Sequence, residues 1–96
     1  MEKKDFEGKL GQTFTFKLEN GETVDLKLNA VDPLKKLEGF DKAREEPFSL
    51  VFSGPASLYL ADNTYKLSVE GAEEQLISIS AFKQEGDSIY YESIFN

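Results

Sequence analysis

Cysteine and histidine are both absent from this chain of 96 residues. Without them the chain cannot form a disulfide, the usual structural zinc sites, a thiolate nucleophile or a hydroxyl–imidazole triad. Thiol redox chemistry and the most frequent hydrolase constellations are therefore excluded. We predict a protein that is not an enzyme and that holds no cofactor or metal, because an enzyme here would have to rely on carboxylates, Lys or Tyr.

Long apolar runs and an excess of positive charge are lacking as well. No segment is long enough to span a bilayer, and residues 1–5 lead into Phe6 without the apolar stretch of a cleaved signal. Eighteen acidic and eleven basic residues give a formal charge of −7, which disfavours phosphate backbones and anionic membranes. We expect no nucleic-acid or membrane partner, and a cytoplasmic location unless export proceeds without a cleaved signal.

Apolar and aromatic residues, by contrast, are plentiful. They include eight Phe and four Tyr within a hydrophobic fraction of 40%, which is enough apolar area to stabilise a core by burial. No linker-like stretch divides the chain, so residues 1–96 are expected to form a single domain.

Alternation of apolar and polar residues with a period of two predicts six or seven short strands. Asn20-Gly21 predicts a tight hairpin between the first two, residues 61–64 predict a second hairpin, and residues 85–87 supply a turn before the last strand. The strands are expected at 13–18, 24–30, 48–53, 58–60, 65–69, 75–82 and 89–95. The fold class is therefore all-β, an antiparallel β-sandwich or a small β-barrel.

One segment, residues 32–46, breaks the strand pattern. Pro33 suits a first helical position, and Leu34, Leu37 and Phe40 recur at three-residue spacing before charged residues interrupt them. We expect a short helix or an ordered loop here.

The facing of the last two strands bears on function. Residues 75–82 present Ile77 and Ile79 on one side and Leu76 on the other, and either side could face the core. If Tyr91 faces the core, the outward residues of the last strand are Tyr90, Glu92 and Ile94. We expect this strand to lie at a sheet edge, where those three residues would form an interaction surface.

Acidic residues offer the only candidate catalytic groups. Asp41, Glu45 and Glu46 lie in the least regular segment and Asp62 lies at a turn, so a paired acid and base is conceivable. A solvated surface explains these carboxylates better, because Asp and Glu are usually exposed. The turns at residues 62–64 and 85–87 each carry too few closely spaced oxygen ligands to bind calcium.

Four segments carry a family resemblance: Leu-Gly-Gln-Thr-Phe at 10–14, Pro-Phe-Ser-Leu-Val-Phe-Ser-Gly-Pro at 47–55, Thr-Tyr at 64–65 and Tyr-Tyr-Glu-Ser-Ile-Phe-Asn at 90–96. With them the chain resembles the bacterial domain of unknown function 6916 over nearly its whole length. It departs from that pattern at 70–74, where an acidic segment replaces a more apolar turn, and near Phe82, where Pro is commoner. The resemblance implies no established activity; the occurrence of members beside phage-tail-like fibre genes favours an assembly role.

Three functions follow from these observations as hypotheses. The leading one is a non-enzymatic interaction or assembly module, whose partner is another protein or a second copy of the chain. The alternative is a small β-barrel that carries an apolar ligand, because eight Phe could line a cavity, although six or seven short strands leave little room for one. The third is a carboxylate-dependent enzyme acting on a sugar.

Overall fold

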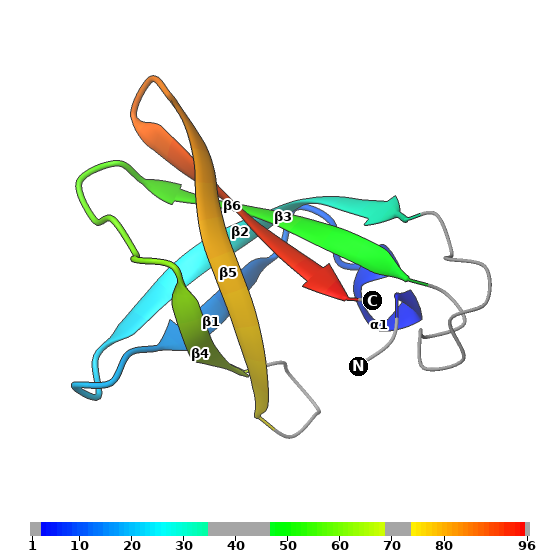
Figure 1. Cartoon of the computed structure of the whole chain (residues 1–96), viewed down its shortest axis with the longest axis horizontal. Helices are drawn as coiled ribbons and strands as arrows, with labels where there is room; N and C mark the ends of the chain where they lie inside the picture. The colour runs from blue at the N-terminus through cyan, green and yellow to red at the C-terminus, as the bar shows by residue number, and fades with distance from the viewer. Residues whose placement is uncertain (1–2, 35–46, 69–73, 96) are drawn as a thin grey trace.

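The computed structural model describes residues 3–34, 47–68 and 74–95 (Figure 1). Within them lie one short helix and six strands: α1 (Lys4–Glu7), β1 (Thr13–Lys17), β2 (Thr23–Pro33), β3 (Phe48–Pro55), β4 (Asn63–Ser68), β5 (Gln75–Glu85) and β6 (Ser88–Phe95). The strands close into a barrel in the order β1-β2-β3-β6-β5-β4, and every neighbouring pair is antiparallel. The all-β prediction is confirmed, and of its two forms the barrel is the one observed. Over the described ranges, no helix is long and apolar enough to cross a membrane.

Two turns follow the predicted chemistry. The β1–β2 hairpin closes at Asn20-Gly21, where Gly21 has φ +88° and its amide bonds the Leu18 carbonyl at 3.0 Å. Only the glycine takes the positive φ, while the Asn20 side chain accepts a hydrogen bond from the Glu22 amide at 3.0 Å. Between β5 and β6 the positive φ lies at Gly86, the first central residue of a two-residue turn. Glycine at that place matches the twist of the flanking strands.

The second predicted hairpin is wrong. Residues 58–60 form no strand, and β3 and β4 are not neighbours, because β4 pairs with β1 and β5 while β3 pairs with β2 and β6. The chain therefore crosses one end of the barrel between Pro55 and Asn63 (Figure 1). We call residues 56–62 the crossing loop. Its run Leu58-Tyr59-Leu60 alternates like a strand, but only Leu60 is buried.

The predicted helical start at Pro33 is also wrong. Pro33 is the last residue of β2 and pairs with Phe48, a strand end where the missing amide hydrogen does the least harm to the ladder. The rest of the expected helix or loop, residues 35–46, lies outside the described residues. The helix that the structure does contain, α1, is only four residues long, too short for its periodicity to show in the sequence.

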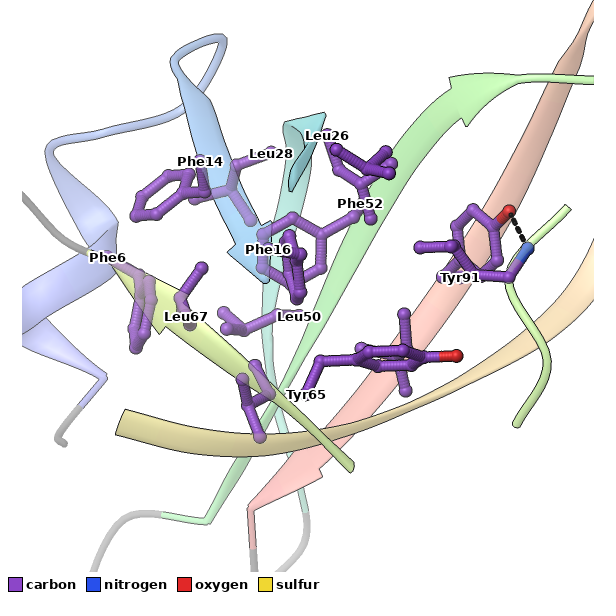
Figure 2. Close-up of a cluster of buried hydrophobic side chains, with 14 of the residues drawn as sticks. Phe6, Phe14, Phe16, Leu26, Leu28, Leu50, Phe52, Tyr65, Leu67 and Tyr91 are labelled. Atoms are coloured by element: carbon purple, nitrogen blue, oxygen red, sulfur yellow. Dashed lines mark hydrogen bonds between the residues drawn. The ribbon is translucent and has the colours of Figure 1, made fainter. Parts of the chain in front are cut away.

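The barrel interior is filled with side chains (Figure 2). Phe16 and Phe52 meet edge-to-face with their ring centroids 5.1 Å apart, and Phe14 contacts the same Phe52 ring at 5.9 Å. The fully buried Phe6 of α1 adds to this cluster, with ring centroids 5.9 Å from Phe14 and 6.1 Å from Phe48. Thus α1 covers one end of the barrel, and the crossing loop covers the other.

The structure shows which side chains of the strands predicted at 75–82 and 89–95 face the core. Ile77 and Ile79 are buried, whereas Leu76 is 71% exposed, so the β-branched residues face the core. Tyr91 is fully buried, which places Tyr90 and its alternating partners outside the barrel, as we expected. The expectation that this last strand lies at a sheet edge is wrong for residues 88–92, which pair with β3 on one side and β5 on the other, whereas residues 93–95 pair with β3 alone among the described strands.

Candidate functional site

The outer face of β6, which consists of Tyr90, Glu92 and Ile94, is the surface that the sequence singled out; we call it the β6 face. All three side chains point away from the core, and Ile94 is 55% exposed while the other two are half-buried. The structure therefore places them together on one surface. Their role as a binding surface stays a prediction.

Tyr90 is held in place by a cation. The Lys83 ammonium lies 4.6 Å from the centroid of the Tyr90 ring, and it also forms an ion pair with Glu85 at 3.2 Å. A cation over an exposed aromatic ring contributes about 0.5–1 kcal/mol. The contact with Lys83 thus restricts the motion of the Tyr90 side chain.

A groove borders the β6 face on the side of β5. It has a volume of ≈ 350 Å³ and is lined by residues 75–78 of β5 and 93–95 of β6; we call it the seam groove. Leu76 and Ile94 flank it, and both are more than half exposed. Figure 1 shows the cause, since β5 and β6 diverge as they run away from their shared turn. The sequence missed this feature, because strand divergence has no residue pattern of its own.

The crossing loop is a second surface with exposed apolar side chains. Buried Tyr91 accepts a hydrogen bond from the Leu60 amide at 3.0 Å (dashed in Figure 2) and donates one to the Leu58 carbonyl at 3.4 Å. Tyr65 donates to the Ala61 carbonyl at 2.7 Å. The two hydroxyls fix the loop, which leaves Tyr59 61% exposed. The sequence did hold a signal for these contacts, because the hydroxyl of a buried Tyr needs a hydrogen-bond partner.

The same tyrosines stay protonated at neutral pH. Burial raises the pKa of the Tyr91 hydroxyl above its usual 10.0, although the hydrogen bond from Leu60 opposes that rise. Burial is also the main reason that the pKa of Tyr65 is raised, and the neighbouring Tyr91 adds to it. Both hydroxyls therefore act as neutral hydrogen-bonding groups.

A family model for the domain of unknown function 6916 matches residues 1–95. The chain belongs to this family. No match was found among curated proteins or among solved structures.

Two of the four segments that carry the resemblance of this DUF6916 domain are neighbours in the barrel. Residues 47–55 contain β3 and residues 90–95 make up most of β6, and the two strands pair from Phe48↔Phe95 to Pro55↔Ser88. The Phe48 and Phe95 rings stack with centroids 4.6 Å apart and planes only 7° from parallel. At Gly54, a Cβ atom would overlap the buried Leu26 side chain. Phe48, Phe95 and Gly54 thus all take part in close packing.

Of the four candidate acidic residues of this DUF6916 domain, the structure describes only Asp62. Asp62 is exposed and accepts a hydrogen bond from the Ala81 amide at 3.3 Å. The other candidates, Asp41, Glu45 and Glu46, lie outside the described residues. Within the described ranges, no three acidic side chains gather closely enough to hold a metal ion.

Proposed function

We propose that this chain is a non-enzymatic interaction module that binds a protein partner through the β6 face and the adjoining seam groove. One observation carries the proposal: Leu76 and Ile94, two large aliphatic side chains on different strands, are more than half exposed on either side of the same groove. Paired apolar groups around a groove are typical of surfaces that become buried by a partner.

The composition of the β6 face supports this function. Tyrosine is enriched among the residues that dominate binding energy, and an ordered side chain loses less entropy when it binds. Tyr90 meets both conditions because Lys83 lies over its ring. Glu92 adds a polar group beside it. The surface thus combines an aromatic anchor, an aliphatic side chain and a charge.

Net charge favours a partner other than a second copy of the chain. Each copy carries a formal charge of −7, so two copies repel at neutral pH. A partner with basic groups opposite Glu92 would instead be attracted and correctly oriented. The setting implied by the family resemblance would make that partner a component of a phage-tail-like fibre.

Photocrosslinking in the native bacterium tests the proposal. A photoreactive amino acid would replace Ile94 in one variant and Leu10, also 55% exposed but far from the groove in sequence, in the control. A discrete crosslinked protein from position 94 and none from position 10 is expected. Tyr90→Ala should weaken the crosslink while lowering the melting temperature by only the few degrees that loss of the Lys83 contact costs. An equal crosslinking pattern from both positions would sink the proposal.

Native mass spectrometry separates the remaining possibilities. A crosslinked species with twice the mass of the chain would identify a second copy as the partner. A retained small molecule of discrete mass would favour the carrier hypothesis instead. The edge-to-face packing of Phe16 on Phe52 inside the barrel favours the interaction module over the carrier, because it fills space that a ligand would need.

A further inference from the structure

Pairing between β5 and β6 stops short of the seam groove. The two strands pair from Ser80↔Glu92 to Glu85↔Ser88, whereas residues 75–79 of β5 pair with β4, and residues 93–95 of β6 pair with β3. Each edge of the groove therefore has a neighbouring strand on its outer side. On the side that faces the groove, the described part of the chain provides no strand.

Alternation along β5 shows which backbone groups face the groove. The Ala81 amide donates to Asp62, which immediately precedes β4, so the backbone polar groups of Ala81 face β4. Backbone direction alternates along a strand, so Ile77 and Ile79 also face β4, while Leu76 and Ser78 face the groove. The hydroxyls of Thr64 and Ser78 lie 2.8 Å apart, as expected for opposite residues whose backbones do not bond each other.

The same argument applies to β6. Ser80 shares the backbone direction of Ser78 and stands opposite Glu92, so the two residues bond across the β5–β6 ladder. Ile94, two residues beyond Glu92, then directs its amide and carbonyl toward the groove. The edges of the groove thus present backbone donors and acceptors from Leu76 and Ser78 on one side and from Ile94 on the other.

We propose that the seam groove accepts an extended segment of a partner protein as an added β-strand. Main-chain hydrogen bonds to an exposed strand edge supply affinity in this mode of recognition, and alternate side chains supply specificity. The inference rests on the proposed function and specifies the form that the partner takes there. It also accounts for the two large aliphatic side chains that flank the groove.

Side chains around the groove define the chemistry of the segment. Leu76 and Ile94 lie on the outer face of the barrel, so they would contact the outward side chains of the added strand, where the aliphatic stem of a lysine packs on apolar surface while its ammonium stays in water. The inward side chains would lie on the same side as buried Ile77 and should be aliphatic. Glu74 and Glu92 lie one or two residues from the groove lining, and Lys66 stands opposite Leu76 on β4. With the chain's charge of −7, the segment should alternate aliphatic and basic residues.

Amide hydrogen exchange measured by NMR tests the free protein first. The amides of Leu76, Ser78 and Ile94 should exchange rapidly, while those of Ile77 and Ser93, which face neighbouring strands, should exchange slowly. Slow exchange at the first three amides in dilute protein would overturn the proposal, because the chain's own residues would already fill the groove. Protection that rises with protein concentration would overturn it in favour of a second copy.

A synthetic peptide of about eight residues that alternates Val and Lys serves as the probe. Its addition should slow exchange at Leu76, Ser78 and Ile94 by about tenfold or more, whereas the same peptide with N-methylated alternate amides should not. Equal effects of both peptides would mean that side chains alone dock, and no effect of either would mean that a strand of this chemistry does not fit. Both results overturn the proposal.

A variant checks the location. Ser78→Pro removes an amide hydrogen that faces the groove but leaves the hydrogen bonds between β5 and β4 in place. Proline is tolerated at such strand edges. The substitution should abolish peptide-induced protection at Ile94. If Ser78→Pro does not fold, Leu76→Lys should weaken the same protection through charge repulsion. If the photoreactive residue at position 94 captures a partner but the peptide protects no amide, strand addition is wrong and the proposed interaction function still stands. If position 94 captures no partner and the peptide protects no amide, both proposals are wrong.

Discussion

Tyr91 is the residue whose hydroxyl connects the core to the surface. It accepts the Leu60 amide and donates to the Leu58 carbonyl, so one buried side chain from β6 orders the loop that joins β3 to β4. The ring belongs to the hydrophobic core and the oxygen belongs to the loop. A change confined to that oxygen therefore separates the two contributions.

Tyr91→Phe should lower the free energy of unfolding by about 1–3 kcal/mol, because the Leu60 amide would be left buried without its acceptor. Tyr59→Phe is the matched control, since the Tyr59 side chain is exposed and loss of its hydroxyl should change the free energy of unfolding by less than about 0.5 kcal/mol. Urea unfolding followed by fluorescence or circular dichroism measures both. Equal stability of the two variants would show that the hydroxyl contributes nothing.

Alkaline pH should destabilise the protein through Tyr91 and Tyr65. Burial raises the pKa of both hydroxyls above 10.0, so the folded state holds its protons to higher pH than the unfolded state does. The stability from this difference is fully present below pH 10.0 and is lost as pH rises through the folded-state pKa values. Unfolding titrations between pH 8 and 11 should show a decline that is shallower in Tyr91→Phe; parallel declines would contradict this.

At the scale of elements, α1 is the clearest case of a segment held by tertiary contacts. Four residues are far too few for a helix to be stable by itself, so its position depends on the ring of Phe6. That ring contacts Phe14, Phe48 and Phe95 with centroid separations of 5.9, 6.1 and 6.2 Å. The helix joins the chain's beginning to β1, β3 and β6.

Phe6→Ala should lower the free energy of unfolding by about 3–5 kcal/mol, the range for deleting a buried Phe side chain. It should also open one end of the barrel, which binding of a fluorescent hydrophobic dye would report. Leu10→Ala provides the control because its side chain is 55% exposed. A small loss of stability with no dye binding would mean that α1 packs less closely than its ring contacts indicate.

Period-two patterns made most strands predictable, and the exceptions have physical causes. The alternation at 13–18, 24–30 and 48–53 survives in β1, β2 and β3 because each has one face in the core. Leu58-Tyr59-Leu60 alternates as well, yet it crosses the end of the barrel, where none of the described strands pairs with it. Alternation indicates which side chains of a segment are buried, but it does not indicate which strand, if any, pairs with that segment.

The candidate site was predictable only in its facing. A buried Tyr91 requires that Tyr90, Glu92 and Ile94 point outward, and the period of two makes that inference from sequence possible. The expected sheet edge was wrong for residues 88–92 of β6, because barrel closure gives them a second neighbour, β5. Divergence of β5 from β6 depends on the bulge between Ala81 and Lys83 and on barrel geometry, which residue patterns do not encode.

For the molecule as a whole, charge and exposed apolar surface act in opposite directions. The formal charge of −7 keeps copies apart at neutral pH, while Leu76, Phe82 and Ile94 each expose at least half of their side chains. Solubility therefore depends on carboxylates remaining ionised.

Near the sequence isoelectric point of about 4.5, the protein should self-associate reversibly, because repulsion between copies vanishes there. Sedimentation velocity at pH 7 and pH 4.5 would measure the change. Ile94→Lys should reduce the association, whereas Leu10→Lys, which adds the same charge elsewhere, should reduce it less. Equal effects of the two variants would show that net charge alone governs association.

The path of the crossing loop sets an order of events in folding. Because β3 and β4 follow each other in the chain without being neighbours, local hairpins cannot complete the barrel, and β6 must return to β3 from the far side of the sequence. Such long-range pairing is slow, and the loop's hydrogen bonds to Tyr91 can form only after β6 is in place. Contacts made after the transition state slow unfolding without speeding folding. In stopped-flow experiments Tyr91→Phe should unfold faster and refold at an unchanged rate, which would make the crossing loop a latch on the completed barrel rather than part of its nucleus.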